Sequence, residues 1–151
     1  MPITRNRVAV LHGVNFDVLE RRDPEVYGGL SLTELESKIS GWARELELEP
    51  IFFQTNSEGE FCEYLHRSVD LADSAIVNAG AWTHYSRAIA DALDLADLPA
   101  VEVHLSDVEN RDDWRRLSVF DGLVLAKICG KGPDGYHEAL ELLASELGAG
   151  S

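Results

Sequence analysis

The chain has 151 residues, of which 45% are hydrophobic and 26% charged, and this size suits one compact domain spanning residues 1–151. Its formal net charge is −14 at pH 7. Such a charge argues against binding to nucleic acid or to an anionic membrane, because phosphate groups attract clusters of Lys and Arg. A small organic acid would also be repelled overall, so a site for one must supply its own local cations.

The amino terminus and the cysteines bear on where the protein works. The first seven residues precede only a short apolar run, which is too short for the core of a signal peptide or for a membrane span. We therefore expect a cytoplasmic protein. Cys62 and Cys129 show no metal-ligand spacing and are too few for a disulfide framework, so we expect reduced, buried thiols, with a single disulfide left open.

The first part of the chain predicts a strand, a long loop and a helix. Val8–Leu11 is short and apolar, as a buried strand is. The stretch 12–30 is long for a connection in a compact domain, and such loops are usually lids or binding loops, so we expect a lid over about 15–30. Ser31 and Glu34 have the spacing of a capping box, which predicts a helix start. The apolar stripe of this helix is Leu32, Leu35, Ile39, Trp42, Ala43 and Leu46.

The rest of the chain alternates strands and helices four more times. The expected strands are Ile51–Phe53, Ala75–Val77, Ala100–Val103 and Leu123–Ala126. Helical stripes are formed by Phe61, Leu65, Ser68, Val69 and Ala72, by Ala88, Ile89, Ala92, Leu93 and Ala96, and by Tyr136, Ala139, Leu140, Leu143 and Leu147. A shorter helix is expected near 107–118, with Ser106 and Glu109 as its capping box. This alternation predicts an α/β fold: a doubly wound, five-stranded parallel sheet with helices on both faces.

Polar side chains follow three of the expected strands at their carboxyl ends, where open parallel sheets bind their ligands. His12 and Asn15 follow the first strand, Asn78 and His84 follow the third, and the fourth ends in residues 102–106. We expect these groups to meet at one edge of the sheet and to form a site there.

Two residue pairs suggest acid–base chemistry at that edge. Glu102 and His104 are two residues apart in a strand, so they face the same side, and a carboxylate that orients an imidazole suits a general acid. Arg22 lies near Tyr27 on the expected lid, and a guanidinium beside a phenol favours the phenolate, which can act as a base. Each pair also has a purely structural interpretation, as a satisfied polar pair and as a packed Tyr beside a solvated Arg.

Two further positions could bind an acid. Asn78 and the backbone after it could receive a carboxylate or hydroxyl groups, although an Asn there could equally cap the next helix. Arg115 or Arg116 could supply the local cation that an acidic substrate needs, or could simply be solvated.

Six motifs in this order resemble the type II 3-dehydroquinate dehydratase family. They occupy residues 11–28, 54–60, 77–84, 101–106, 111–116 and 135–136, and the similarity runs from about residue 8 to 143. The resemblance implies a flavodoxin-like fold and a cofactor-free reaction of the shikimate pathway, which leads to the aromatic amino acids. In that reaction 3-dehydroquinate loses water by anti elimination through an enolate, giving 3-dehydroshikimate. It also implies a homo-oligomer, trimers assembling into a dodecamer.

The same resemblance implies a role for each matching residue. Tyr27 matches the general base, Arg22 the lid arginine that favours the tyrosinate, and Asn15 the residue that holds a water on the enolate oxygen. His104, oriented by Glu102, matches the acid that protonates the departing hydroxyl. The positions that match substrate-binding residues are Asn78, Leu105 and Ser106 for the carboxylate, His84 and Arg115 for the remaining hydroxyls, and Asp91, which reaches a neighbouring subunit's site.

Departures from the family pattern keep an alternative open. Residues 12–17 read His-Gly-Val-Asn-Phe-Asp, where the family usually has Asn-Gly-Pro-Asn-Leu-Asn, Glu20 replaces a usual glycine, and Leu117 a usual histidine. A misplacement of about 1 Å around a reacting group can cost on the order of 100-fold in rate. The alternative is a dehydroquinase-like homologue with drifted or lost activity that binds a related cyclic hydroxy acid.

Two other classes of protein fit the sequence less well. Three histidines at strand ends, His12, His84 and His104, could bind zinc, but Tyr27 and Glu102 would then have no purpose, and we expect no metal. The fold could also belong to a signalling receiver or a flavin carrier. A receiver needs acidic residues after the first strand and an Asp after the third, where this chain has His12 and Asn78, and no Ser/Thr-rich phosphate loop follows the first strand.

Overall fold

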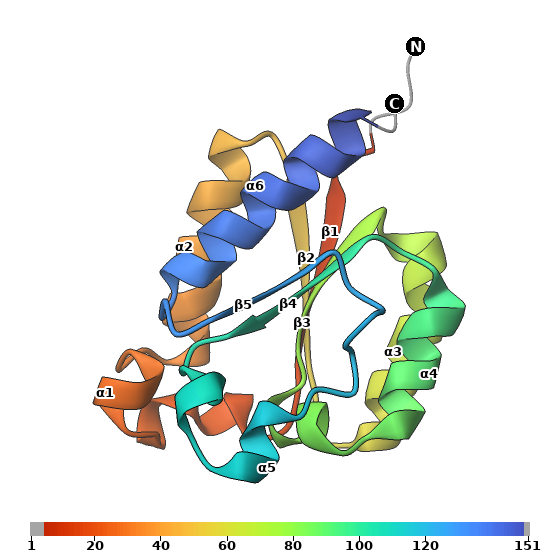
Figure 1. Ribbon diagram of the computed structural model, residues 1–151. Coiled ribbons are helices and arrows are strands. Elements are labelled where there is room, and N and C mark those ends of the chain that lie inside the picture. The colour runs from red at the N-terminus through yellow and green to blue at the C-terminus, as the bar shows by residue number, and fades with distance from the viewer. Residues whose placement is uncertain (1–4, 150–151) are drawn as a thin grey trace.

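A computed structural model describes residues 5–149 and shows a sheet of five parallel strands in the order β2-β1-β3-β4-β5 (Figure 1). The strands are β1 (Arg7–His12), β2 (Glu49–Gln54), β3 (Ser74–Asn78), β4 (Ala100–His104) and β5 (Ala126–Cys129). This is the flavodoxin-like order that we expected. The chain reverses its direction across the sheet between β1 and β3, and the crevice beyond that point is where such sheets bind ligands.

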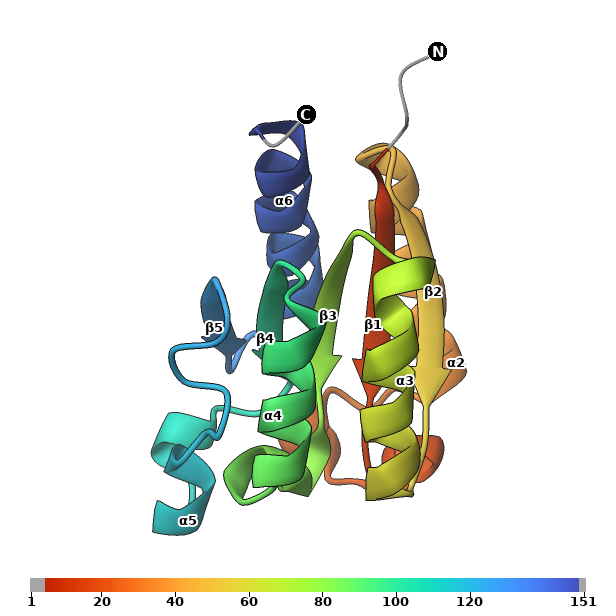
Figure 2. The same ribbon diagram turned by 90° about the vertical axis from the view of Figure 1, so that its right-hand side faces the viewer.

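Two helices cover each face of the sheet. The long helices α2 (Leu32–Glu45) and α6 (Asp134–Ala149) lie on one face, and α3 (Glu58–Leu71) and α4 (Arg87–Ala96) lie on the other (Figure 2, with α3 and α4 nearest the viewer). Each pair of helices encloses its own hydrophobic cluster against the sheet. The doubly wound architecture predicted from the sequence is therefore confirmed.

Local sequence explains the helix starts and the central strands. In β3 and β4 every residue is buried, as expected for parallel strands covered on both faces. The capping box at α2 is present: the Glu34 backbone N–H donates to Ser31 Oγ at 3.1 Å, and the Ser31 N–H donates to the Glu34 carboxylate at 3.2 Å. Ser57 and Ser86 cap α3 and α4 through their side-chain oxygens, which accept from the backbone N–H groups of Glu60 and Ile89.

The position of the last strand was predicted wrongly. The apolar run Leu123–Ala126 is mostly a turn before β5, which begins at Ala126 and pairs only with β4. Leu123 and Val124 instead pack against the cluster beneath α3 and α4. An edge strand has one neighbour and needs no continuous apolar sequence, so the run marked a buried segment rather than the strand itself.

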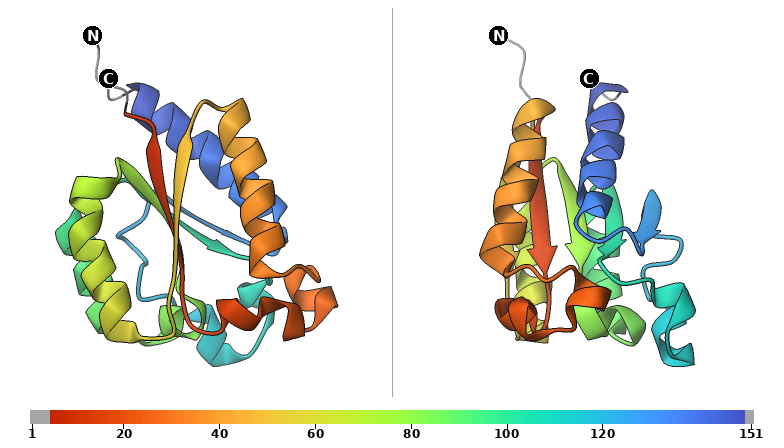
Figure 3. Two further views of the ribbon diagram at one scale, coloured as in Figure 1. Left: turned by 180° about the vertical axis from the view of Figure 1, so that it is seen from behind. Right: turned by 90° about the vertical axis from the view of Figure 1, so that its left-hand side faces the viewer.

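The expected helix near 107–118 is two short pieces, η3 (Val108–Asn110) and α5 (Asp113–Arg116), with Arg111 extended between them. No side-chain cap forms at η3, because the Ser106 hydroxyl, at 3.3 Å, instead accepts a hydrogen bond from Arg111. The long stretch 12–30 also has structure: a 3-10 helix, η1 (Phe16–Arg21), and one turn of α-helix, α1 (Pro24–Tyr27). Figure 3 shows both packed below the ends of the strands.

Two smaller expectations concern the cysteines and the membrane. Cys62 and Cys129 are half-buried and form no disulfide with each other, so of the expected reduced, buried thiols the burial was wrong. Within residues 5–149, no helix is long and apolar enough to cross a bilayer.

Candidate active site

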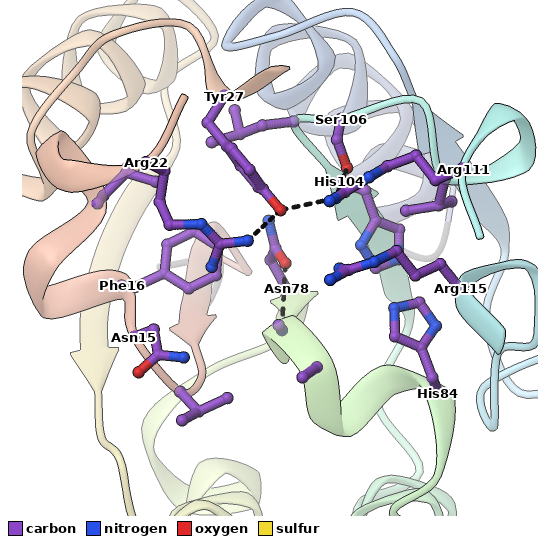
Figure 4. A pocket seen from close by; sticks show the side chains of 16 residues that line it. Asn15, Phe16, Arg22, Tyr27, Asn78, His84, His104, Ser106, Arg111 and Arg115 are labelled. Carbon is purple, nitrogen blue, oxygen red and sulfur yellow. Dashed lines mark hydrogen bonds between the residues drawn. The ribbon is translucent and has the colours of Figure 1, made fainter. Parts of the chain in front are cut away.

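A pocket opens beyond the carboxyl ends of the strands, between the segment after β1 and the loops after β3 and β4 (Figure 4). Most of the residues expected at the site line it. They are Asn15, Arg22, Tyr27, Asn78, His84, His104, Leu105, Ser106 and Arg115. The sequence-based expectation that these strand ends converge is therefore met, and the chemistry depends on how the side chains are held.

Two glycines let the loops after β1 and β3 cross in contact. A side chain on Gly13 would place its Cβ 2.2 Å from the backbone oxygen of Ala79, and one on Gly80 would meet the backbone oxygen of Val14 at 2.9 Å. Gly80 also has φ +65, a conformation that glycine adopts without strain. The Gly13 N–H donates to the Asn78 carbonyl at 2.9 Å. This crossing fixes where Asn15 and Asn78 enter the pocket.

Tyr27 occupies the centre of the pocket mouth between two arginines. Arg22 and Arg111 both donate hydrogen bonds to its hydroxyl oxygen, the latter at 2.6 Å (Figure 4). The guanidinium of Arg22 also lies over the phenol ring, 4.1 Å from its centre. Two cationic donors therefore meet on one oxygen atom, an arrangement that stabilises negative charge placed there.

Arg111 was missed among the candidate residues. The sequence held a partial signal, because Arg111 opens the same motif as Arg115 and lies seven residues after His104. The helix expected across 107–118 did not indicate whether the Arg111 side chain points into the pocket or into solvent. In the structure the break between η3 and α5 turns Arg111 towards the pocket, where it bridges Tyr27 and Ser106.

His104 is held from behind by a fully buried carboxylate. Its Nε2 lies 2.5 Å from Glu102, and the Ser118 hydroxyl donates to the same carboxylate at 2.9 Å. Since the carboxylate only accepts, Nε2 carries a proton, and Nδ1 is the nitrogen left for exchange in the pocket. The pairing that the sequence predicted is confirmed, and Ser118 is an additional partner that spacing could not reveal.

His84 and Arg115 form the wall opposite Asn15. His84 Nδ1 lies 2.8 Å from the Leu117 carbonyl oxygen, which can only accept, so Nδ1 carries the proton. Burial lowers the pKa of His84, which favours the neutral ring and leaves Nε2 as an acceptor. The Arg115 guanidinium lies 4.1 Å from the centre of the Trp114 ring. Of the two arginines considered, Arg115 lines the pocket, whereas Arg116 pairs with the exposed Asp113.

Behind the pocket, three polar side chains meet on one hydroxyl. Tyr136 Oη lies 2.8 Å from His12 Nε2 and accepts a hydrogen bond from Asn78 Nδ2 at 3.1 Å. All three side chains are buried. Burial lowers the pKa of His12 to about 3 and raises the pKa of Tyr136, so both are neutral near pH 7. His12 was expected at the edge of the site and instead lies beneath it.

Asp91 and two alternative roles remain to be compared with the structure. Asp91, expected to reach a neighbouring subunit's site, lies exposed on α4 and does not line the pocket of its own chain. The zinc hypothesis needs His12, His84 and His104 around one ion, but each of these histidines is hydrogen-bonded to a different partner. Within residues 5–149, no group of three or more His, Cys, Asp or Glu is placed to hold a metal ion. The Asn78 side-chain oxygen accepts a hydrogen bond from the Gly80 N–H, at the start of the 3-10 helix η2 (Gly80–His84), while Ser86 caps α4.

Comparison with known proteins identifies the family. Residues 6–144 match the family described as dehydroquinase class II. The 3-dehydroquinate dehydratase of Syntrophotalea carbinolica is 46% identical over 142 residues, covering 93% of this chain and 95% of that protein. That of Halothermothrix orenii is 42% identical over 146 residues, covering 97% and 99%.

Solved structures agree with this assignment. The type II dehydroquinase of Propionibacterium acnes superposes with a TM-score of 0.88 at 36% identity, covering 93% of this chain and 97% of that one. The type II dehydroquinase of Butyrivibrio crossotus also superposes with a TM-score of 0.88, at 30% identity and with 92% and 97% covered. These matches do not favour a receiver, a flavin carrier or a relative that has lost its activity. The chain belongs to the class II dehydroquinase family.

Proposed function

We propose that this protein is a type II 3-dehydroquinate dehydratase, which removes water from 3-dehydroquinate by anti elimination to give 3-dehydroshikimate. The observation that carries the proposal is the pair of ionisable groups in one pocket: Tyr27 between two guanidiniums, and His104 backed by buried Glu102. An elimination of this kind needs a base on one side of the substrate and an acid on the other.

The base is Tyr27 as its phenolate. It takes the proton from the carbon beside the ketone, and the electron pair of the broken C–H bond moves into the carbonyl to form an enolate. Arg22 and Arg111 stabilise the phenolate before this step, since both hydrogen-bond its oxygen. Asn15 faces the pocket and holds a water molecule on the enolate oxygen, where negative charge develops.

The acid is His104. When the enolate collapses, the bond to the hydroxyl breaks, and His104 gives that oxygen a proton from Nδ1, so that it leaves as water. Glu102 stabilises the charged imidazole before the transfer. Tyr27 then holds one extra proton and His104 lacks one, and return of that proton through solvent restores the enzyme.

The remaining pocket residues bind the substrate. Asn78 and the backbone N–H groups of Leu105 and Ser106 hold its carboxylate, and His84 and Arg115 hold its other hydroxyls. The chain has a net charge of −14, which repels an acidic substrate overall. The arginines of the pocket offset this repulsion by supplying positive charge where the substrate binds. No step calls for a cofactor.

Mixing purified protein with 3-dehydroquinate and following the ultraviolet absorbance of the conjugated product tests the proposal. We expect a signal that scales with enzyme concentration in the wild type and is strongly reduced in Tyr27→Phe and in Arg22→Ala. Arg21→Ala is the matched control, because Arg21 is exposed and outside the pocket, and it should keep normal turnover. A wild type with no activity at high protein concentration would refute the function.

The proposal extends to assembly and location. We propose a single-domain, cytoplasmic enzyme of the shikimate pathway that forms trimers, four of which make a dodecamer. Support comes from large apolar side chains left exposed on and beside α4, with Leu95 76% exposed and Tyr85 61% exposed. Exposed Asp91 on the same helix is then free to enter a neighbour's pocket. Sedimentation at micromolar concentration should give a mass close to twelve chains, and a monomer would contradict this part.

A further inference from the structure

The side chain of Asn78 lies in the middle of the pocket, and the orientation of its amide decides what it offers to a ligand (Figure 4). One orientation presents N–H to the pocket and the other presents oxygen. An anionic group is bound by the first and repelled by the second. What fixes the amide is therefore a determinant of substrate binding.

Two contacts fix it from below. The Gly80 backbone N–H lies 3.4 Å from Asn78 Oδ1, and a backbone N–H can only donate, so the oxygen must face Gly80. Nδ2 then faces Tyr136 and donates one of its two protons to the hydroxyl oxygen at 3.1 Å. The second Nδ2 proton remains for the pocket.

The Tyr136 hydroxyl needs an acceptor for its own proton. Its oxygen already receives a proton from Asn78, so the single O–H points to the other neighbour, His12 Nε2, at 2.8 Å. His12 must therefore be neutral, with Nε2 unprotonated and the proton on Nδ1. Hydrogen bonds then run in one direction, from Asn78 through Tyr136 to His12.

The surroundings of His12 agree with a neutral ring and show which of its atoms stays unpaired. His12 is fully buried and packs against Phe16, with ring centres 4.8 Å apart, an environment that disfavours a charged imidazole. His12 Nδ1 is also buried and has no hydrogen-bond partner among residues 5–149. This direction of the chain leaves the Nδ1 proton unpaired, whereas the opposite direction would leave the Tyr136 hydroxyl proton unpaired.

We propose that His12 is a positioning residue: by accepting the Tyr136 proton it sets the direction of the Asn78–Tyr136–His12 chain and turns an N–H of Asn78 towards the carboxylate of the substrate. A donor at position 12 would reverse the chain. Tyr136 would then donate to Asn78, and the amide would have to present its oxygen to the pocket. This inference rests on the proposed function for its substrate.

Kinetics on three variants test it. His12→Phe keeps a flat ring but removes the acceptor, and we expect KM for 3-dehydroquinate to rise about 10-fold or more, with kcat changed less. Tyr136→Phe breaks the same chain at its centre and should give a similar rise. His12→Gln replaces Nε2 by a carbonyl oxygen that can accept, so KM should return to within about threefold of the wild-type value.

The double variant separates positioning from general destabilisation. If the two residues act through one chain, His12→Phe with Tyr136→Phe raises KM no more than either change alone, whereas independent effects would multiply. Ser68→Ala is the matched control, since it removes another buried hydroxyl, on α3, and should leave KM unchanged. Circular dichroism confirms that each variant is folded before KM is measured.

Each outcome decides one point. An active wild type with unchanged KM in folded His12→Phe or Tyr136→Phe overturns the inference and leaves the proposed function standing. Equal losses in His12→Phe and His12→Gln also overturn it, because the acceptor would not be what matters. An inactive wild type overturns the proposed function and this inference together.

Discussion

His12 makes the stability of this protein depend on pH in a way that one substitution isolates. Burial lowers the pKa of the folded-state imidazole from 6.5 to about 3. Between these values the unfolded chain binds a proton at His12 and the folded protein does not, so the free energy of unfolding falls as the pH falls. This loss of unfolding free energy is absent well above pH 6.5 and grows steadily as the pH falls towards 3.

The size of the effect follows from the two pKa values. A pH of 5 lies about 1.5 units below the pKa of the unfolded chain. At about 1.4 kcal/mol per unit, protonation of the unfolded chain then lowers the free energy of unfolding by about 2 kcal/mol. His12→Phe cannot bind the proton in either state and lacks this loss. Other groups titrate in both proteins, so their contributions cancel in the difference.

Urea denaturation of both proteins at pH 7.5 and pH 5, at one fixed protein concentration, measures this difference. We expect wild type to lose about 2 kcal/mol more than His12→Phe between the two pH values, whatever the variant costs at pH 7.5. Equal losses in the two proteins would show that His12 is protonated in the folded state, and the neutral acceptor deduced from the Tyr136 hydrogen bond would be wrong.

Three further substitutions probe other parts of the pocket. Arg111→Met should lower kcat on the order of 100-fold with little change in melting temperature, because Tyr27 loses one of its two cationic donors; a near-normal kcat in stopped-time assays would rule out that role. Glu102→Gln should lower kcat by roughly 100-fold or more and flatten the dependence of kcat on pH, since a neutral amide no longer stabilises the charged imidazole; an unchanged pH–rate profile would count against the pair. Gly13→Ala should destabilise the fold by about 3 kcal/mol or prevent folding, as its Cβ would lie 2.2 Å from a backbone oxygen; thermal unfolding close to wild type would contradict the crossing.

Much of the fold followed from hydrophobic periodicity, because most elements bury one face against the sheet. The capping box at Ser31 and the stripes of α2, α3, α4 and α6 were found this way and are present, except that Val69 and Ala88, both predicted as stripe residues, are exposed. Hydrophobic periodicity gave the wrong element where an apolar segment is buried without being a strand or a helix. Leu123 and Val124 are apolar because they lie over a core, yet they lie in a turn before the edge strand.

The candidate site was predicted in outline because the carboxyl ends of parallel strands meet at one edge of the sheet. Spacing within one strand was enough to pair Glu102 with His104. It could not show which direction a side chain takes from an irregular loop, so Arg111 was missed and Ser118 was not connected to Glu102. The burial of His12 beneath the site depends on Tyr136, which lies 124 residues away in the chain.

The two arginines on Tyr27 come from different parts of the molecule, so the contacts of this one hydroxyl depend on how those parts are placed. Arg22 and Tyr27 belong to one short segment after β1, whereas Arg111 belongs to the loop after β4. Outward movement of the first segment would carry Arg22 and Tyr27 together and leave Arg111 behind. The Tyr27 hydroxyl would then keep one of its two cationic donors, so both donors reach it only when the two parts of the molecule meet.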